Sequence, residues 1–146
     1  MSREGAAQNV EKILKRCREA GLRRTRALVA VIRTLASRDT PTTLADLAKE
    51  ELMEETCDQA TIYRILIRLE EEGITRRLGL HNRAAYYILN YPETHRDYLI
   101  CTECGMIDTL DVSCPVEALE KEISNQSGYK KLYHELEFFG VCPDCA

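Results

Sequence analysis

Four of the seven cysteines form two Cys-x2-Cys pairs, and this spacing is typical of zinc ligands. The pairs are Cys101 with Cys104 and Cys142 with Cys145, and 37 residues separate them. Each pair can present two thiolates from one tight turn, so two such turns can surround a tetrahedral ion completely. Because no coordination position is left for a substrate, we expect a structural zinc site that stabilises this part of the chain.

Two other interpretations of these four cysteines remain open, namely two unrelated pairs or a thiol–disulfide switch. A redox Cys-x2-Cys normally begins a helix that follows a strand, and neither pair has that setting. The other three cysteines stand alone. Cys17 lies on an apolar helix face and is expected in the core. Cys57 and Cys114 precede predicted helices, where a sensor role is the alternative to a structural one.

The segment from Asp58 to Gly73 has the properties of a helix that contacts DNA. Asp58 is a good N-cap, Gly73 is a good stop, and apolar residues recur between them with helical spacing. The polar or small residues near its start are Gln59, Ala60, Thr61, Tyr63 and Arg64. Glutamine can pair with a base edge, alanine or threonine can contact a thymine methyl, and tyrosine and arginine can reach bases or phosphates. We therefore predict that this helix enters a major groove.

Arginines cluster in two further segments that could contact the same DNA. The clusters are Arg23, Arg24 and Arg26 at the start of one predicted helix, and Arg76, Arg77 and Arg83 in a predicted hairpin. Such side chains can hold phosphates or enter a minor groove. For any single arginine the alternative is an ordinary solvated surface charge.

Apolar periodicity predicts the elements that position these residues. Helices are expected at residues 9–20, 25–37, from 44 onward, and 58–73. The period then changes to two, so 74–80 and 84–89 predict a β-hairpin around residues 81–83. Helices followed by a basic hairpin predict a winged helix-turn-helix domain over residues 1–89.

A second domain is expected after a hinge at residues 90–94, where Pro92 interrupts the pattern. Residues 1–90 contain 16 basic and 13 acidic residues, whereas 91–146 contain 4 and 11, so any DNA contact belongs to the first part. Strands are predicted at 98–101, 106–110 and 129–139, with a helix from Pro115 to about Gly128. The predicted fold class is α+β, with a small C-terminal α/β domain over 95–146.

The overall composition is that of an ordinary globular chain. Of the 146 residues, 45% are hydrophobic and 30% are charged, which argues against wholesale disorder. The longest aliphatic run, 27–32, is far shorter than the roughly 20 residues that cross a bilayer, and no secretory signal is readable. We expect a soluble, cytoplasmic protein.

Five motifs in this order resemble the ferric uptake regulator family of bacterial metal-dependent repressors. They are GLRRT at 21–25, ATIYRIL at 60–66, RLEEEGI at 68–74, LICTECG at 99–105 and FGVCPDC at 139–145. The resemblance implies a winged-helix N-terminal domain and a C-terminal dimerisation domain. It also implies a homodimer that binds a palindromic DNA operator when its sensing metal is bound.

The resemblance also implies metal sites, and here the sequence departs from the family. The positions of the usual interdomain site hold poor ligands, namely Pro41, Ile88, Tyr98 and Thr109. Better ligands lie close to them in sequence, namely Asp39, His81, Asp108 and Asp111. A second family site matches His95, Asp97, Glu117 and His134. Two imidazoles and two carboxylates suit Zn2+, Fe2+ or Mn2+.

The resulting hypothesis is a metal-responsive DNA-binding regulator, a repressor, and not an enzyme. One alternative is a DNA-binding dimer held by zinc alone, without metal sensing, and another is a peroxide-sensing variant. A metalloenzyme using His95, Asp97 and His134 is the third alternative, but the sequence has no nucleophile motif or phosphate-binding loop.

Overall fold

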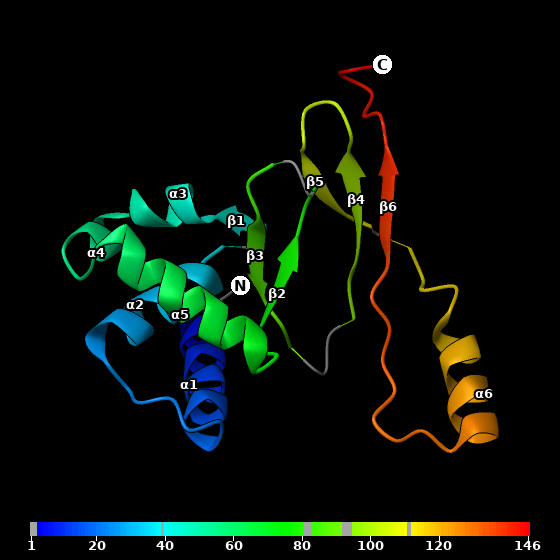
Figure 1. Cartoon of the computed structure of the whole chain (residues 1–146), viewed down its shortest axis with the longest axis horizontal. Coiled ribbons are helices and arrows are strands. Elements are labelled where there is room, and N and C mark those ends of the chain that lie inside the picture. Colours follow the sequence, from blue (N-terminus) through cyan, green and yellow to red (C-terminus); the bar gives the residue numbers. More distant parts are fainter. Residues whose placement is uncertain (1–2, 39, 81–82, 92–94, 111) are drawn as a thin grey trace. The chain divides into compact units, whose positions relative to one another are not determined.

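The computed structural model describes all residues except 1–2, 39, 81–82, 92–94 and 111. The chain divides into two compact units, Met1–Thr94 and His95–Ala146, both of which contain helices and strands (Figure 1). Among the described residues, no helix is both long enough and apolar enough to cross a bilayer.

The first unit is a group of helices packed on a small sheet (Figure 1). Its helices are α1 (Arg3–Glu19), α2 (Arg26–Ala36), α3 (Leu44–Ala48), α4 (Glu51–Glu54) and α5 (Gln59–Glu71). Thr25 caps α2, because its hydroxyl accepts a hydrogen bond from the Leu28 amide at 3.1 Å. The buried faces of α1, α2 and α5 meet in one apolar core that includes Ile13, Val31 and Leu66. This core fixes α5 by one face and leaves the opposite face exposed.

Three antiparallel strands complete the first unit, in the order β1–β3–β2. They are β1 (Thr42–Thr43), β2 (Thr75–Leu78) and β3 (Tyr86–Leu89). The predicted hairpin is therefore present as β2 and β3, while its tip at 81–82 lies outside the described residues. The two-residue β1 was expected to be only a turn and a helix cap. It becomes a strand because β3 offers a free edge on that side.

The first two residues of the predicted hinge at 90–94 contact the first unit. The Asn90 amide donates to the Ile74 carbonyl at 2.9 Å, and Tyr91 packs against the core of the first unit. Residues 92–94 lie outside the described residues.

The second unit has a three-stranded sheet in the order β5–β4–β6 and one helix. The elements are β4 (Asp97–Cys101), β5 (Ile107–Leu110), α6 (Glu117–Ser127) and β6 (Glu137–Gly140). β5 is antiparallel to β4, whereas β6 is parallel to it, with Cys101 opposite Gly140. Gly128 ends α6 in the left-handed conformation (φ 74°), as its position at the predicted helix end indicated.

The last strand is shorter than the predicted 129–139. In the parallel register Tyr98 is opposite Glu137, so residues before 137 extend past the start of β4 at Asp97. The Leu136 carbonyl still accepts from the Tyr98 amide at 3.2 Å, but the described residues before it have no strand beside them and form none.

The apolar face predicted for α6 is not covered within its own unit. Within the described part of the chain, α6 has no buried residue, and Leu119 and Ile123 are 50% and 44% exposed. The pattern of apolar residues is therefore correct for a helix, but the described part of the second unit does not bury this helix face.

Candidate functional site

The four paired cysteines come together at the ends of β4 and β6. Cys101 is the last residue of β4, and Cys142 follows β6 by two residues. Because these strands are parallel neighbours, both Cys-x2-Cys turns lie at the same edge of the sheet. All four Sγ atoms lie within 4.8 Å of one another, and Cys104 Sγ is 3.9 Å from Cys142 Sγ. Thiolates about 2.3 Å from a tetrahedral zinc ion lie about 3.8 Å apart, so the quartet fits zinc.

Backbone amides prepare one of these sulfurs for ligation. The amides of Cys104 and Cys142 donate to Cys101 Sγ at 3.5 and 3.3 Å. These hydrogen bonds lower the pKa of the Cys101 thiol to about 6. In contrast, side-chain hydrogen bonds with Cys142 and Cys104, together with burial, raise the pKa of Cys145 to about 12. Without a cation, the four sulfurs are therefore not all deprotonated. A bound cation would stabilise all four as thiolates.

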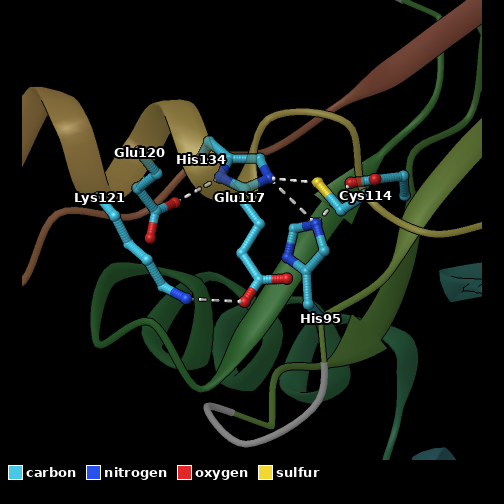
Figure 2. Close-up of polar contacts among 7 residues, drawn as sticks. His95, Cys114, Glu117, Glu120, Lys121 and His134 are labelled. Carbon is cyan, nitrogen blue, oxygen red and sulfur yellow. Dashed lines mark hydrogen bonds and ion pairs between the residues drawn. The ribbon is translucent and has the colours of Figure 1, made fainter.

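A second group of metal-ligating atoms lies in the same unit. His95, Asp97, Cys114 and His134 each offer one ligand atom, and these atoms lie within 4.8 Å of one another. His134 Nε2 is 3.0 Å from His95 Nε2 and 3.0 Å from Cys114 Sγ (Figure 2). His95 Nε2 is also 2.9 Å from Asp97 Oδ1. Three of the four predicted residues are thus in one cluster, and Cys114 is the fourth member.

The carboxylate of Asp97 is suited to a cation. Asp97 is 4% exposed, and among the described residues no donor makes a well-aligned hydrogen bond to its Oδ1. His95 Nε2 lies 2.9 Å from this oxygen, but not in hydrogen-bonding geometry. Burying a carboxylate oxygen without a donor is costly, and a bound metal ion would remove that cost.

Glu120 orients His134. Its carboxylate contacts the Nδ1 atom of His134, on the ring side opposite Cys114 and His95 (Figure 2). A proton on Nδ1 leaves the Nε2 lone pair directed at the other ligand atoms. Carboxylates commonly support metal-binding histidines in this way.

The predicted ligand Glu117 lies outside this cluster. Its carboxylate is 68% exposed and accepts a hydrogen bond from Lys121 at 3.4 Å, outside the cluster (Figure 2). Glu120, one helical turn later, is the α6 carboxylate that reaches His134. Cys114 and Glu120 were not predicted, although a lone cysteine three residues before Glu117 is a signal that could have indicated a ligand.

The positions considered for the interdomain site differ in whether the structure describes them. Asp39, His81 and Asp111 lie outside the described residues, and Asp108 is an exposed residue of β5. Pro41, Ile88 and Tyr98 are buried.

The start of α5 presents the surface that was predicted to contact DNA. Asp58 caps the helix, since its carboxylate accepts from the Thr61 amide at 2.9 Å. Hydrogen bonds from the side chain and then the amide of Thr61 lower the pKa of Asp58. Ile62 and Leu66 are fully buried. The exposed residues are Gln59, Ala60, Tyr63 and Arg64, and Thr61 is half-buried.

An open groove joins this surface to one of the arginine clusters. Arg23, Thr25, Thr61 and Arg64 all line it, so residues from the start of α2 and from α5 share one surface. Arg24 is exposed and lies 3.5 Å from Glu11. Residues separated by about 40 positions in sequence thus contribute cationic groups to a single face.

The predicted wing arginines do not share one face. Arg76 and Arg77 are consecutive residues of β2, and successive strand side chains point to opposite sides of a sheet. Arg77 is exposed, whereas Arg76 is half-buried. Arg83, beyond β2, is also exposed, so Arg77 and Arg83 are placed as surface cations and Arg76 is not.

Comparisons with known proteins agree on one family. Residues 19–139 match the model of the ferric uptake regulator family. A ferric uptake regulation protein of Campylobacter upsaliensis is 31% identical over 140 residues, covering 93% of this chain and 88% of the relative. One from Neisseria meningitidis serogroup A is 36% identical over 86 residues, covering 59% of this chain and only 58% of the relative. The structure of the ferric uptake regulator from Pseudomonas aeruginosa with manganese is 25% identical, with a TM-score of 0.73, and covers 88% of this chain and 96% of that one.

Proposed function

The chain belongs to the ferric uptake regulator family, and from this premise we propose that it is a metal-responsive repressor that binds a palindromic DNA operator as a homodimer. The observation that carries the DNA-binding part is the groove shared by Arg23, Thr61 and Arg64 at the exposed start of α5. A helix anchored by buried Ile62 and Leu66 can present this face to a major groove without losing its own packing.

In this proposal the first unit is a winged helix-turn-helix domain. α5 is its recognition helix, with Gln59, Ala60 and Thr61 nearest the bases and Tyr63 and Arg64 reaching bases or phosphates. Arg23 and Arg24 hold phosphates or enter a minor groove beside it. β2 and β3 form the wing, where Arg77 contributes the charge.

We assign the four-cysteine cluster to structural Zn2+. A filled four-thiolate site offers no open position, so its contribution is to hold β4, β6 and their turns together. Zinc bound to such sites contributes on the order of 10 kcal/mol to folding, which is decisive for a unit of this size.

The sensing metal is assigned to the cluster that contains His95, Asp97 and His134. His95 is the first residue of the second unit, so a metal bound to it fixes the point where that unit begins. A ligand that binds one arrangement of the molecule better than another shifts the population toward it. On this basis metal binding favours the arrangement in which a dimer can contact DNA.

A homodimer is supported by the apolar surface of the second unit. Its exposed large apolar side chains include Leu119, Ile123, Tyr133, Phe138 and Phe139. A second copy covering this surface would place two α5 helices on one duplex, as a palindromic site requires. DNA as the partner implies a cytoplasmic protein.

The proposal is tested by DNA binding with and without metal. A palindromic duplex is first selected from a random pool with metal-loaded protein, and its affinity is then measured after chelation and after adding back Zn2+, Fe2+ or Mn2+. We expect tight binding only with metal present. The variant Arg64→Ala should bind more weakly and lower the slope of log affinity against log salt by about one, while Arg18→Ala on α1 should not.

The same assay separates the alternatives. If His95→Ala and His134→Ala change neither metal content nor DNA affinity, the protein is a DNA-binding dimer held by zinc alone. If peroxide, rather than chelation, releases the iron-loaded protein from DNA, it is a peroxide sensor. If no duplex is selected under any metal condition, the proposed function is wrong.

A further inference from the structure

We infer that Cys114 is a thiolate ligand of the second metal cluster, which gives that cluster two imidazoles, one carboxylate and one thiolate and makes it selective for Zn2+ over Mn2+. The inference rests on the proposed metal site of His95, Asp97 and His134, and it names the fourth ligand and the metal class.

The first argument is the convergence of ligand atoms. Cys114 Sγ and His95 Nε2 both lie 3.0 Å from His134 Nε2. His95 Nε2 lies 2.9 Å from Asp97 Oδ1, so four potential ligand atoms form a continuous set. Ligands of a tetrahedral ion with bonds of about 2.0–2.3 Å lie about 3.3–3.8 Å apart, which small side-chain rotations would provide here.

The second argument is that two of these groups are already prepared for a cation. Asp97 Oδ1 is buried and, among the described residues, has no well-aligned hydrogen-bond donor. Glu120 contacts His134 Nδ1, which leaves Nε2 to face the sulfur of Cys114 (Figure 2). Without metal, that nitrogen can accept the thiol proton in a hydrogen bond. When metal binds, the thiol proton leaves to solvent, and sulfur and nitrogen both direct lone pairs at the ion.

The third argument concerns metal preference. Thiolate is a soft ligand that favours zinc, whereas carboxylate oxygens suit manganese. The predicted ligand Glu117 would have given two imidazoles and two carboxylates, but its side chain is directed to Lys121 instead. Replacing one carboxylate by a thiolate shifts the set toward Zn2+ and away from Mn2+.

The test uses the full-length protein with zinc in the four-cysteine site and one equivalent of Co2+ in the second site. A thiolate bound to Co2+ gives a charge-transfer band in the near ultraviolet, which imidazole and carboxylate ligands do not give. We expect the band in the wild type and in the control Cys57→Ser, and its loss in Cys114→Ser. Retained zinc, measured on each sample, shows that Co2+ has not entered the four-cysteine site.

Affinity provides the second readout. Competition with a chromophoric chelator should show Zn2+ affinity falling about tenfold or more in Cys114→Ser, with Mn2+ affinity changing far less. Cys114→Asp should favour Mn2+ relative to the wild type, because it restores an oxygen ligand. Thermal unfolding of each variant checks that the unit remains folded.

Either of two results would overturn the inference. One is a charge-transfer band that persists in Cys114→Ser, and the other is a Zn2+ to Mn2+ preference that is the same in the wild type, Cys114→Ser and Cys114→Asp. Failure of the proposed function looks different. If Cys114→Ser behaves as expected but DNA binding ignores the second metal, then Cys114 is a ligand of a site without a sensing role. If DNA binding depends on His95 and His134 but Cys114→Ser changes nothing, the function stands and the inference fails.

Discussion

At the scale of residues, the second unit contains two ligand clusters with different chemistry. The four-cysteine cluster has only soft ligands and one sulfur, Cys101, that is already stabilised as a thiolate by backbone amides. The other cluster mixes imidazole, carboxylate and thiol and is partly exposed. The affinity and exchange rate of a bound metal depend on such differences in ligands. We therefore expect the four-cysteine cluster to retain its ion and the second cluster to exchange its ion.

The supporting role of Glu120 leads to the first prediction. Glu120→Gln removes the charge that holds the His134 ring, so metal affinity of the second cluster should fall about 10- to 100-fold. Glu117→Gln, on the same helix, should leave metal affinity nearly unchanged because Glu117 contacts Lys121. Isothermal titration with Zn2+ measures both variants. A larger loss in Glu117→Gln than in Glu120→Gln would show that the helix presents the other carboxylate to the metal.

The four-cysteine cluster gives the second prediction. Cys104→Ser should purify with about one zinc ion fewer per chain and unfold at a markedly lower temperature, because a tetrahedral site does not survive loss of one thiolate. Cys57→Ser, whose cysteine belongs to neither cluster, is the control. Metal analysis and calorimetry check the result, and equal zinc content in the two variants would contradict the assignment.

At the scale of elements, the cap of α5 links stability to pH. Hydrogen bonds from the side chain and the amide of Thr61 hold the pKa of Asp58 below its usual value. Because the folded-state pKa is the lower one, the stabilisation is complete above the unfolded pKa, about pH 4, and is lost as pH falls through the folded value. Asp58→Ala should therefore lower the unfolding temperature at pH 7, and this difference should shrink in acid.

Asp58→Asn is the matched control for this third prediction, because asparagine caps helices without titrating. The difference in unfolding temperature between Asp58→Asn and Asp58→Ala should be the same at pH 3.5 and pH 7. Circular dichroism melts across this range make the measurement. Comparing variants with one another removes the effect of metal loss in acid, since all carry the same cysteines. If the unfolding temperature of the wild type exceeds that of Asp58→Ala by more in acid than at pH 7, the predicted direction of the pH dependence is wrong.

The two faces of α5 give the fourth prediction, in which neighbouring residues have opposite effects. Ile62 is fully buried, so Ile62→Ala should cost about 2–5 kcal/mol of unfolding free energy. Tyr63 is 51% exposed, and Tyr63→Ala should change stability by less than about 0.5 kcal/mol while weakening DNA binding. Urea unfolding and DNA titration separate the two effects. Tyr63→Ala that binds DNA normally would remove this residue from the proposed interface.

Elements whose ends are set by local chemistry could be predicted from the sequence. Thr25 and Asp58 cap α2 and α5, and Gly128 ends α6, since each of these interactions lies within a few residues of the helix end. β1 and the start of β6 could not be predicted in this way, because each depends on which strand lies beside it. Pairing partners far apart in sequence are not encoded in local periodicity.

The candidate sites follow the same division. The cysteine quartet was recognisable because each Cys-x2-Cys pair is a local turn. The second cluster combines the start of β4, the loop before α6 and the segment before β6, so the participation of Cys114 and Glu120 depended on tertiary structure. Arg76 was expected to put charge on the wing together with Arg77, but strand alternation turns the two side chains to opposite faces of the sheet.

At the scale of the whole molecule, the second unit leaves several large apolar side chains exposed. Phe138 and Phe139 are consecutive residues of β6 and therefore point to opposite faces of the sheet, yet they are 44% and 54% exposed. Helix α6 likewise exposes Leu119 and Ile123. These exposed apolar side chains support the proposed homodimer, because a closed two-fold dimer is the commonest way to bury such surface.

The fifth prediction tests this proposed interface. Phe139→Glu would bury a charge in a dimer, so the variant should sediment as a monomer under conditions in which the wild type is a dimer. Leu52→Glu, a residue of α4 in the first unit that is 43% exposed, is the control and should remain dimeric.

The monomeric Phe139→Glu variant should keep its four-cysteine zinc, because all four ligands come from one chain. It should lose most of its affinity for a palindromic duplex but not for a single half-site, because each α5 helix still recognises its own half. If Phe139→Glu remains a dimer, and the variant with both Phe138→Glu and Phe139→Glu does too, the interface lies elsewhere. If a monomeric variant binds the palindrome normally, dimerisation is not required for DNA recognition.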